Sequence, residues 1–268
     1  MKKTKKQKII FLTSVLALAP FGLQAQDSGD RITVPFRDAS RPRTVVVNLI
    51  QGSITVHAYN GNDAIVEGSH VAARRRDGDR SGMHQIYPPG GMEITEDNNV
   101  ITIHGDIIHS SNITVQVPVQ TSLKLKTVNG GKISVDGVSG DIEADNTNGS
   151  VIITDCSGSV VASSTNGKVT VSLNRVTPNK SMSFSTMNGT VDVTLPAETK
   201  ANLRMRTDNG EIWSDFDVKL EGTRSTQDQT SRNGHRIRID KTVYGTINGG
   251  GPEIQMVSFN GTIYLRKK

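Results

Sequence analysis

Cysteine and aromatic residues are scarce in this sequence. Its 268 residues include one cysteine, Cys156, and only 4% of them are aromatic. A single thiol cannot form an internal disulfide, so the fold must be stabilised by packing and hydrogen bonds. Cys156 lies in an alternating run with no catalytic motif around it, which favours a small structural side chain over a nucleophile. The inward residues are mostly narrow aliphatic ones, which suit a thin interior.

Motifs for catalysis and metal binding are also lacking. The six histidines form no HExxH pair and no cluster with cysteine, and the glycine-rich segment 248–252 lacks the lysine of a phosphate-binding loop. We therefore expect no cofactor, no metal site and no enzymatic activity. The alternative is a polysaccharide-cleaving enzyme, which needs two carboxylates on one face. Its candidates, which we interpret instead as charges that keep strands soluble, are Asp141, Glu143, Asp145 and Asp192.

Long hydrophobic runs are absent except near the N-terminus. Residues 1–8 carry five lysines, and a short apolar run broken by Pro20 follows them and ends at small residues up to Ala25. This pattern is typical of a secretory signal peptide at residues 1–25, so we predict a periplasmic or secreted protein without a transmembrane segment after cleavage. Removing residues 1–25 leaves 26 basic and 26 acidic residues, so nothing indicates nucleic-acid binding.

Asn-Gly pairs recur from residue 129 onward, the first five at intervals of 18 to 22 residues. Ser139-Gly140 and Ser157-Gly158 fall halfway between the first pairs, so each half-step is one short strand and one tight turn. Two positions before each asparagine stands a serine, threonine or asparagine that can bond to turn backbone, and we expect the glycines to accept positive φ angles. The predicted structural turns are Asn129, Gly130, Asn148, Gly149, Asn166, Gly167, Asn188, Gly189, Asn209 and Gly210.

The segments between the turns alternate between apolar and polar residues. After Gly167, for example, Val169, Val171 and Leu173 would share one face. This period of two indicates half-buried strands, and no segment after residue 30 has a helical period. A meander of hairpins would fit, because Asn-Gly is a strong hairpin signal. The regular period instead favours an all-β solenoid, with equivalent strands about 4.8 Å apart and ladders of polar side chains along the turns.

The sequence resembles a known family most closely at residues 127–173, which read TVNGGKISVDGVSGDIEADNTNGSVIITDCSGSVVASSTNGKVTVSL. This is the "putative adhesin" family, a domain of unknown function in exported bacterial proteins, marked by repeated T-x-N-G-x-I-x-V and G-x-V-S-G-D-I-x-A strings. Residues 47–68 and 112–130 resemble its earlier strands, so the resemblance covers most of residues 43–215. It implies a right-handed β-helix-like fold and an extracytoplasmic location, and it carries no catalytic motif.

A single solenoid domain is predicted for residues 26–268. An arginine-rich loop insertion at 74–91 interrupts the first strands, and the regular coils occupy residues 127–217. After a polar loop, the closing strands at 235–268 are expected to form a terminal strand cap.

Two surfaces are candidates for ligand binding. Trp213, the only tryptophan, and Tyr264 are expected to face outward, where exposed aromatic rings can stack on sugars. We favour instead the interpretation that the chain from residue 235 onward covers Trp213 as a cap. The second surface is the loop at 74–91, which either binds an anionic polymer or lipid headgroups or is simply solvated. Its candidate residues are Arg74, Arg75, Arg76 and Tyr87.

The predicted function is that of an exported, non-catalytic, adhesin-like binding module at the bacterial envelope. We expect its partner to be an envelope polysaccharide or a protein. The alternatives are the polysaccharide-cleaving enzyme and a structural or stress-linked envelope protein that acts through partner chains. The sequence leaves open the identity of the ligand, the oligomeric state and the choice between the periplasm and the cell exterior.

Overall fold

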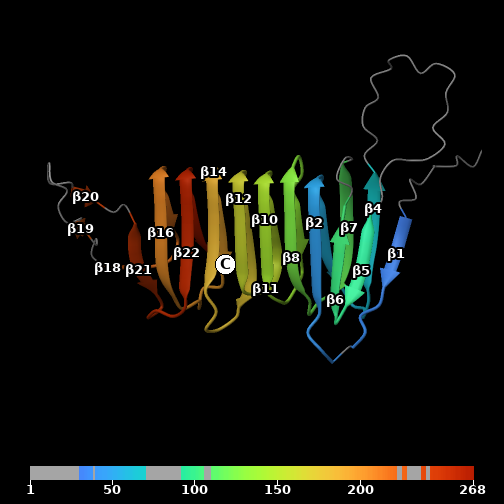
Figure 1. Ribbon diagram of the computed structural model, residues 1–268. Helices are drawn as coiled ribbons and strands as arrows, with labels where there is room; N and C mark the ends of the chain where they lie inside the picture. Colours follow the sequence, from blue (N-terminus) through green and yellow to red (C-terminus); the bar gives the residue numbers. More distant parts are fainter. Residues whose placement is uncertain are drawn as a thin grey trace, which may run out of the picture.

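The computed structural model describes residues 30–38, 40–70, 92–105, 110–221, 225–227, 237–239 and 242–268. All regular elements in these ranges are β-strands, and nearly all of them belong to two large sheets (Figure 1). A search of the described residues for a helix long and apolar enough to cross a membrane finds none.

The two large sheets are called sheet A and sheet B. In spatial order, sheet A contains β1 (Asp30–Val34), β4 (Ala64–His70), β7 (Ser111–Pro118), β3 (Ile54–Tyr59), β9 (Ile133–Asp136), β11 (Val151–Gly158), β13 (Val169–Val176), β15 (Val191–Leu195), β23 (Ile263–Lys267) and β17 (Ile212–Ser214). Sheet B contains β18 (Lys219–Glu221), β21 (Val243–Ile247), β16 (Ala201–Asn209), β22 (Glu253–Asn260), β14 (Met182–Asn188), β12 (Val160–Asn166), β10 (Ile142–Asn148), β8 (Ser122–Asn129), β2 (Thr44–Gln51), β6 (Val100–His104) and β5 (Glu93–Asp97). A separate pair consists of β19 (Ser225–Gln227) and β20 (Ile237–Ile239).

From β6 to β18 the chain alternates between the two sheets, one strand in each, and so forms coils. Strand β10 of sheet B leads into β11 of sheet A, and β12 leads into β13 in the same way. Equivalent strands of neighbouring coils pair in parallel. Antiparallel pairs in the two large sheets occur near their ends, as in β1–β4, β5–β6 and β16–β21. The predicted solenoid is therefore confirmed, and a meander of hairpins is excluded for the coils.

The core lies between the two sheets and is built from the inward half of each alternating strand. Val169, Val171 and Leu173 of β13 are all buried, as their spacing predicts. Phe184 of β14 is the largest fully buried side chain among the residues that the structure describes. Cys156 of β11 is also buried in this core, and its burial raises the pKa of the thiol to about 11. Its surroundings fit a structural side chain and disfavour the thiolate that a nucleophile requires.

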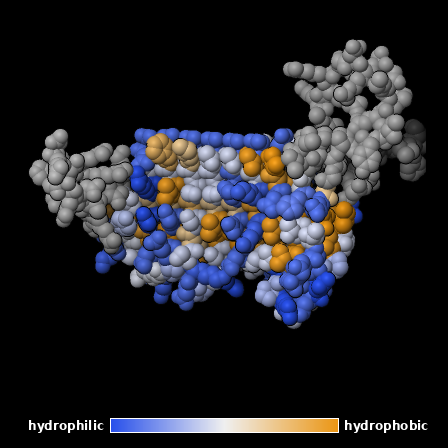
Figure 2. All heavy atoms as spheres, viewed as in Figure 1, coloured by the Kyte–Doolittle hydropathy of each residue, from blue (hydrophilic) through white to orange (hydrophobic). Residues whose placement is uncertain are grey.

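A ladder of side-chain amides runs along the Asn-Gly turns. Five asparagines donate from Nδ2 to Oδ1 of the asparagine in the adjacent coil, at distances of 2.8 to 3.0 Å, and Asn129 at the end of the row only accepts. In spatial order the asparagine ladder consists of Asn129, Asn148, Asn166, Asn188, Asn260 and Asn209. A continuous hydrophilic line follows the edge where the strands of sheet B end (Figure 2).

A second ladder explains the small polar residue two positions before each asparagine. The side chain points inward and donates to the carbonyl oxygen of a turn glycine in the neighbouring coil. Ser164 Oγ donates to Gly149 O at 2.8 Å, and Thr186 Oγ1 donates to Gly167 O at the same distance. Asn146 replaces the hydroxyl with an amide, whose Nδ2 lies 2.9 Å from Gly131 O. These bonds satisfy buried turn carbonyls and fix the register between coils.

Glycine is required at the central turns for a reason other than the expected one. The expectation of a positive φ is wrong for Gly149, Gly167, Gly189 and Gly210, while it holds for Gly130. The central glycines stack so closely that a Cβ atom on Gly167 would lie 2.2 Å from the carbonyl oxygen of Gly149. The constraint is therefore the close approach of one coil's backbone to the next.

The last two strands lie inside the stack of coils. Strand β22 pairs in parallel with both β14 and β16, and β23 pairs in parallel with both β15 and β17 (Figure 1). The closing strands at 235–268 were expected to cap the end, but only β21 does so, by pairing antiparallel with β16 and β18. The reason is chemical, because Ser258 and Asn260 repeat the coil motif and supply both ladders in an interior position.

Candidate functional site

Trp213 and Tyr264 lie next to each other on the outer face of sheet A. They are directly opposite on the neighbouring strands β17 and β23, and Trp213 is 58% exposed. The indole Nε1 donates to Glu211 Oε2 at 2.9 Å. The alternative expectation that the chain from residue 235 covers Trp213 is therefore wrong, because that chain enters the stack as β22 and β23. We call Trp213 and Tyr264 the aromatic surface.

A charged pair borders the aromatic surface. The guanidinium carbon of Arg266 lies 4.9 Å from the centre of the Tyr264 ring, which is a cation–π distance. The same guanidinium forms two bonds to Asp192, at 2.7 and 3.2 Å. These hydrogen bonds and the charge of Asp192 raise the pKa of Arg266. One side of Tyr264 is thus occupied by Arg266, so Trp213 is the ring that is open to a ligand.

The second predicted surface falls outside the residues that the structure describes. Arg74, Arg75, Arg76 and Tyr87 all belong to the segment 71–91. Their proposed binding of an anionic polymer stays a prediction from the sequence.

The four carboxylates considered for an enzyme do not all lie on one face. Asp192 lies on sheet A, whereas Glu143 and Asp145 lie on β10 of sheet B. Each is engaged by a basic side chain, with Asp145 3.8 Å from Lys126 Nζ. The other pairs are Asp141 with Lys180, Glu143 with Lys124, and Asp192 with Arg266.

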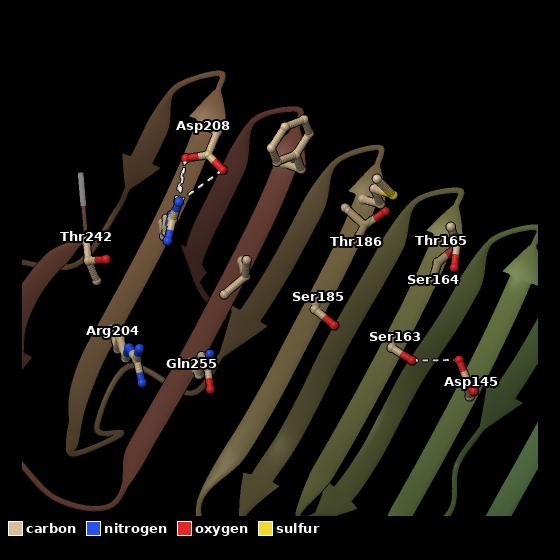
Figure 3. Close-up of a pocket in the computed structure, with 14 residues that line it drawn as sticks. Asp145, Ser163, Ser164, Thr165, Ser185, Thr186, Arg204, Asp208, Thr242 and Gln255 are labelled. Carbon is tan, nitrogen blue, oxygen red and sulfur yellow. Dashed lines mark hydrogen bonds and ion pairs between the residues drawn. The ribbon is translucent and has the colours of Figure 1, made fainter. Parts of the chain in front are cut away.

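A groove that sequence reasoning missed lies on the outer face of sheet B (Figure 3). It is open and has a volume of about 690 Å³. Nearly all of its lining residues come from the neighbouring strands β10, β12, β14, β22 and β16. Its floor consists of the short side chains Ser163 and Ser185 with Val257 and Gln255. One wall carries Asp145, and the other carries Arg204, Arg206 and Asp208.

Two apolar side chains close one end of the groove. Met187 is 52% exposed and Phe259 is 46% exposed, and they sit opposite each other on β14 and β22. On this face the hydrophobic side chains form separate patches among hydrophilic ones (Figure 2). The groove therefore combines a small apolar area with polar groups of both hydrogen-bonding kinds.

Comparisons with known proteins identify the family of this chain. A family model described as Toastrack DUF4097 matches residues 32–248. The chain belongs to this family. The family has no assigned function, and the resemblance seen in the sequence is confirmed at that level. No curated protein matches the chain.

Two solved structures resemble the Toastrack chain at low identity. One is titled a "putative cell adhesion protein" from Clostridium sporogenes ATCC 15579, with a TM-score of 0.44, 11% identity, and coverage of 90% of this chain and 100% of that one. The other is titled a "putative adhesin" from Bacteroides fragilis NCTC 9343, with a TM-score of 0.29, 9% identity, and coverage of 89% and 97%.

Sequence reasoning missed the groove because its parts are scattered along the Toastrack chain. In the sequence, Asp145 and Arg204 are simply outward polar positions of two alternating strands, and nothing connects them. The register of the five strands places Asp145 in line with Ser163 and Ser185, and it brings β16, which carries Arg204, to the other side of these serines. The spacing of the coils predicts the first part of this register, and the insertion of β22 changes the rest.

Proposed function

We propose that this Toastrack protein is an exported, non-catalytic binding module that holds an envelope polysaccharide on the aromatic surface. The observation that carries the proposal is the outward pairing of Trp213 with Tyr264 on neighbouring strands. The two strands lie about 4.8 Å apart, so the two aromatic positions form one surface along a single line.

Sugar rings suit this surface because they have both apolar and polar faces. An exposed indole packs on the C–H face of a sugar, while nearby polar groups bond to its hydroxyls. Glu211 accepts from the Trp213 indole, and the Arg266–Asp192 pair lies beside Tyr264. Polar groups therefore lie beside both rings of the aromatic surface.

The proposed location outside the cytoplasm rests on the N-terminal segment. Lysines in residues 1–8, the apolar run and the small residues before Ala25 form the pattern of an export signal. Cell fractionation and the N-terminal sequence of the recovered protein test this part directly. Recovery of a chain that starts at Met1 in the cytoplasm would contradict it.

Trp213 provides its own signal for the binding test, because it is the only tryptophan. The full chain is produced, recovered after export and titrated with a panel of purified envelope polysaccharides. We expect red-shifted emission that iodide quenches, and protection from iodide by one class of polymer. An emission that no polymer protects would overturn the proposed site.

A matched pair of variants distinguishes specific binding at the aromatic surface from non-specific binding. Trp213→Ala should reduce the affinity for the polymer at least tenfold by calorimetry. Leu220→Ala removes a side chain that is 68% exposed on β18 of sheet B, and it should leave the affinity unchanged. Equal affinities for wild type and Trp213→Ala would exclude the aromatic surface.

The same samples discriminate the two alternative functions. Release of reducing ends from the bound polymer would indicate a glycan-cleaving enzyme. A mass in solution that rises with concentration, without polymer binding, would favour a structural role through partner chains.

A further inference from the structure

We propose that the groove on sheet B is a second binding site, that it takes a linear carboxylated polysaccharide, and that Arg204 receives the carboxylate. The site lies on the sheet opposite the aromatic surface and does not depend on it. The two sites would let one molecule hold two polymer chains on its two faces.

The shape of the groove follows from the lengths of its side chains. From β10 to β16 there are four steps between strands, so the backbones of the two walls are about 19 Å apart. The floor between them carries serine and valine side chains, whereas the walls carry aspartate and arginine. The result is an open hollow with a low floor between two charged walls, on which an extended chain can lie.

The occupant is a polysaccharide rather than a peptide strand because the backbone of the floor has no free edge. Strands β10, β12, β14, β22 and β16 form an unbroken parallel ladder. Extended peptides gain much of their affinity by adding a strand to an open edge. This face offers only side chains, which suit a ligand whose hydroxyls cover its whole length.

Several polar groups near the groove are already engaged. Ser164 and Thr186 donate to turn carbonyls. Asp145 accepts from Ser163 Oγ at 2.8 Å, and Arg206 forms a fork with Asp208 at 2.9 and 3.3 Å (Figure 3). These contacts shape the walls and leave little capacity for a new charge.

Arg204 is the charged group of the lining that remains available. It forms no ion pair with any residue that the structure describes, and it lies opposite Gln255 on the neighbouring strand β22 (Figure 3). Guanidinium groups bind carboxylates through two parallel hydrogen bonds. The Gln255 amide beside it can donate to a sugar hydroxyl and also accept from one. This pair selects a chain that carries both carboxylates and hydroxyls.

The apolar end of the groove completes the match. Met187 and Phe259 present neighbouring exposed surfaces next to Asp208. The C–H face of a sugar ring can cover them while its hydroxyls reach the polar floor.

The test compares two forms of one polymer. Binding of the full chain to oligogalacturonate is measured by calorimetry, against the same oligomer with its carboxylates methyl-esterified. We expect at least tenfold weaker binding of the ester. Arg204→Gln should weaken binding of the acid form at least tenfold and remove the difference between the two forms. Equal binding of both forms by the wild type would overturn the proposal.

Three controls make the result specific. Arg175→Gln, at an exposed position of β13 in sheet A, should bind as the wild type does. Gln255→Ala should weaken binding of both forms, which checks the site with a second change. Trp213→Ala should have no effect here, so a failure of this site and a failure of the aromatic surface are told apart. Tighter binding of poly-glutamate than of oligogalacturonate, lost in Arg204→Gln, would overturn the assignment to a sugar.

Discussion

The side-chain amide of Asn260 donates to Oδ1 of Asn188 at 2.8 Å, although the two residues are 72 positions apart in the sequence. The next bond, from Asn209 to Asn260, spans 51 positions, whereas the bonds between the earlier coils span 18 to 22. The asparagine ladder therefore continues without a break at the place where neighbouring coils are no longer consecutive in the sequence. It joins the inserted strand β22 to both of its neighbours.

The asparagine ladder should make a measurable contribution to stability. Asn166 donates to Asn148 and accepts from Asn188, so Asn166→Ala removes two amide–amide bonds. Because these bonds are exposed, we expect a loss of about 1 kcal/mol in the free energy of unfolding, measured with urea. Asn48→Ala, on the outer face of β2 where the side chain makes no bond to described residues, is the matched control. Equal losses in both variants would show that the ladder is not stabilising.

The stacked glycines should tolerate a methyl group less well than a glycine with a positive φ. In Gly167→Ala the new Cβ would lie 2.2 Å from a backbone oxygen, which only a shift of a whole coil can relieve. We expect a loss of about 3 kcal/mol or more. Gly130→Ala has open space and a φ of 79°, so it should lose only about 1 kcal/mol. A larger loss in Gly130→Ala, by urea unfolding, would contradict the stacking argument.

Cys156 should make the stability depend on alkaline pH. Its folded pKa of about 11 lies above the ordinary value of 9.0, so the unfolded chain loses the proton first. Stability should therefore fall as pH rises from about 9 to 11, by up to roughly 2–3 kcal/mol. The measurement is the difference in unfolding free energy between wild type and Cys156→Ala across this range. A difference that stays constant with pH would be inconsistent with a buried thiol.

The same burial should protect Cys156 from reagents. A thiol reagent that acts on thiolates should label the unfolded chain at pH 8 and leave the folded chain unlabelled. Rapid labelling of the folded protein would mean that the coil around Cys156 opens readily.

The inserted strands should hold the last coil in place. A chain that ends after residue 250 lacks β22 and β23, so β16 and β17 lose their parallel neighbours. We expect hydrogen exchange to become fast in β16 while β10 and β12 stay protected, because coils depend mainly on their neighbours. Met256→Asp, which places a charge at a fully buried position of β22, should give the same pattern in a full-length chain. Continued protection of β16 in both variants would mean that it pairs directly with β14.

The coils themselves were predictable because their signals are local and repeat at a fixed interval. The alternation of Val169, Val171 and Leu173 predicts one buried face, and the Asn-Gly pairs predict where each strand ends. The polar residue before each pair predicts a bond to the turn backbone, which Ser164 makes with Gly149. Each of these inferences needs only a few neighbouring residues.

The order of the last coils was not predictable from the same signals. The motif around Asn260 fits any coil of the stack, and nothing in it says that its neighbours are Asn188 and Asn209. Consecutive elements are usually adjacent in space, and that default favours a cap. The exposure of Trp213 and the groove beside Arg204 both depend on this insertion, so they emerged only from the three-dimensional arrangement.

The insertion of β22 and β23 also sets the time at which the protein can finish folding. The coils from β8 to β15 can form one after another as the chain is synthesised, because each pairs with the coil before it. Strands β16 and β17 are made next, but their parallel partners in residues 253–267 do not yet exist. The last coil is then joined to the others by contacts between strands that are far apart in the sequence, not by pairing with the coil made just before it. Such long-range contacts slow the final stage of folding. A nascent chain that stops short of these residues can build most of the coils and still lack the strands that join the last coil to the others.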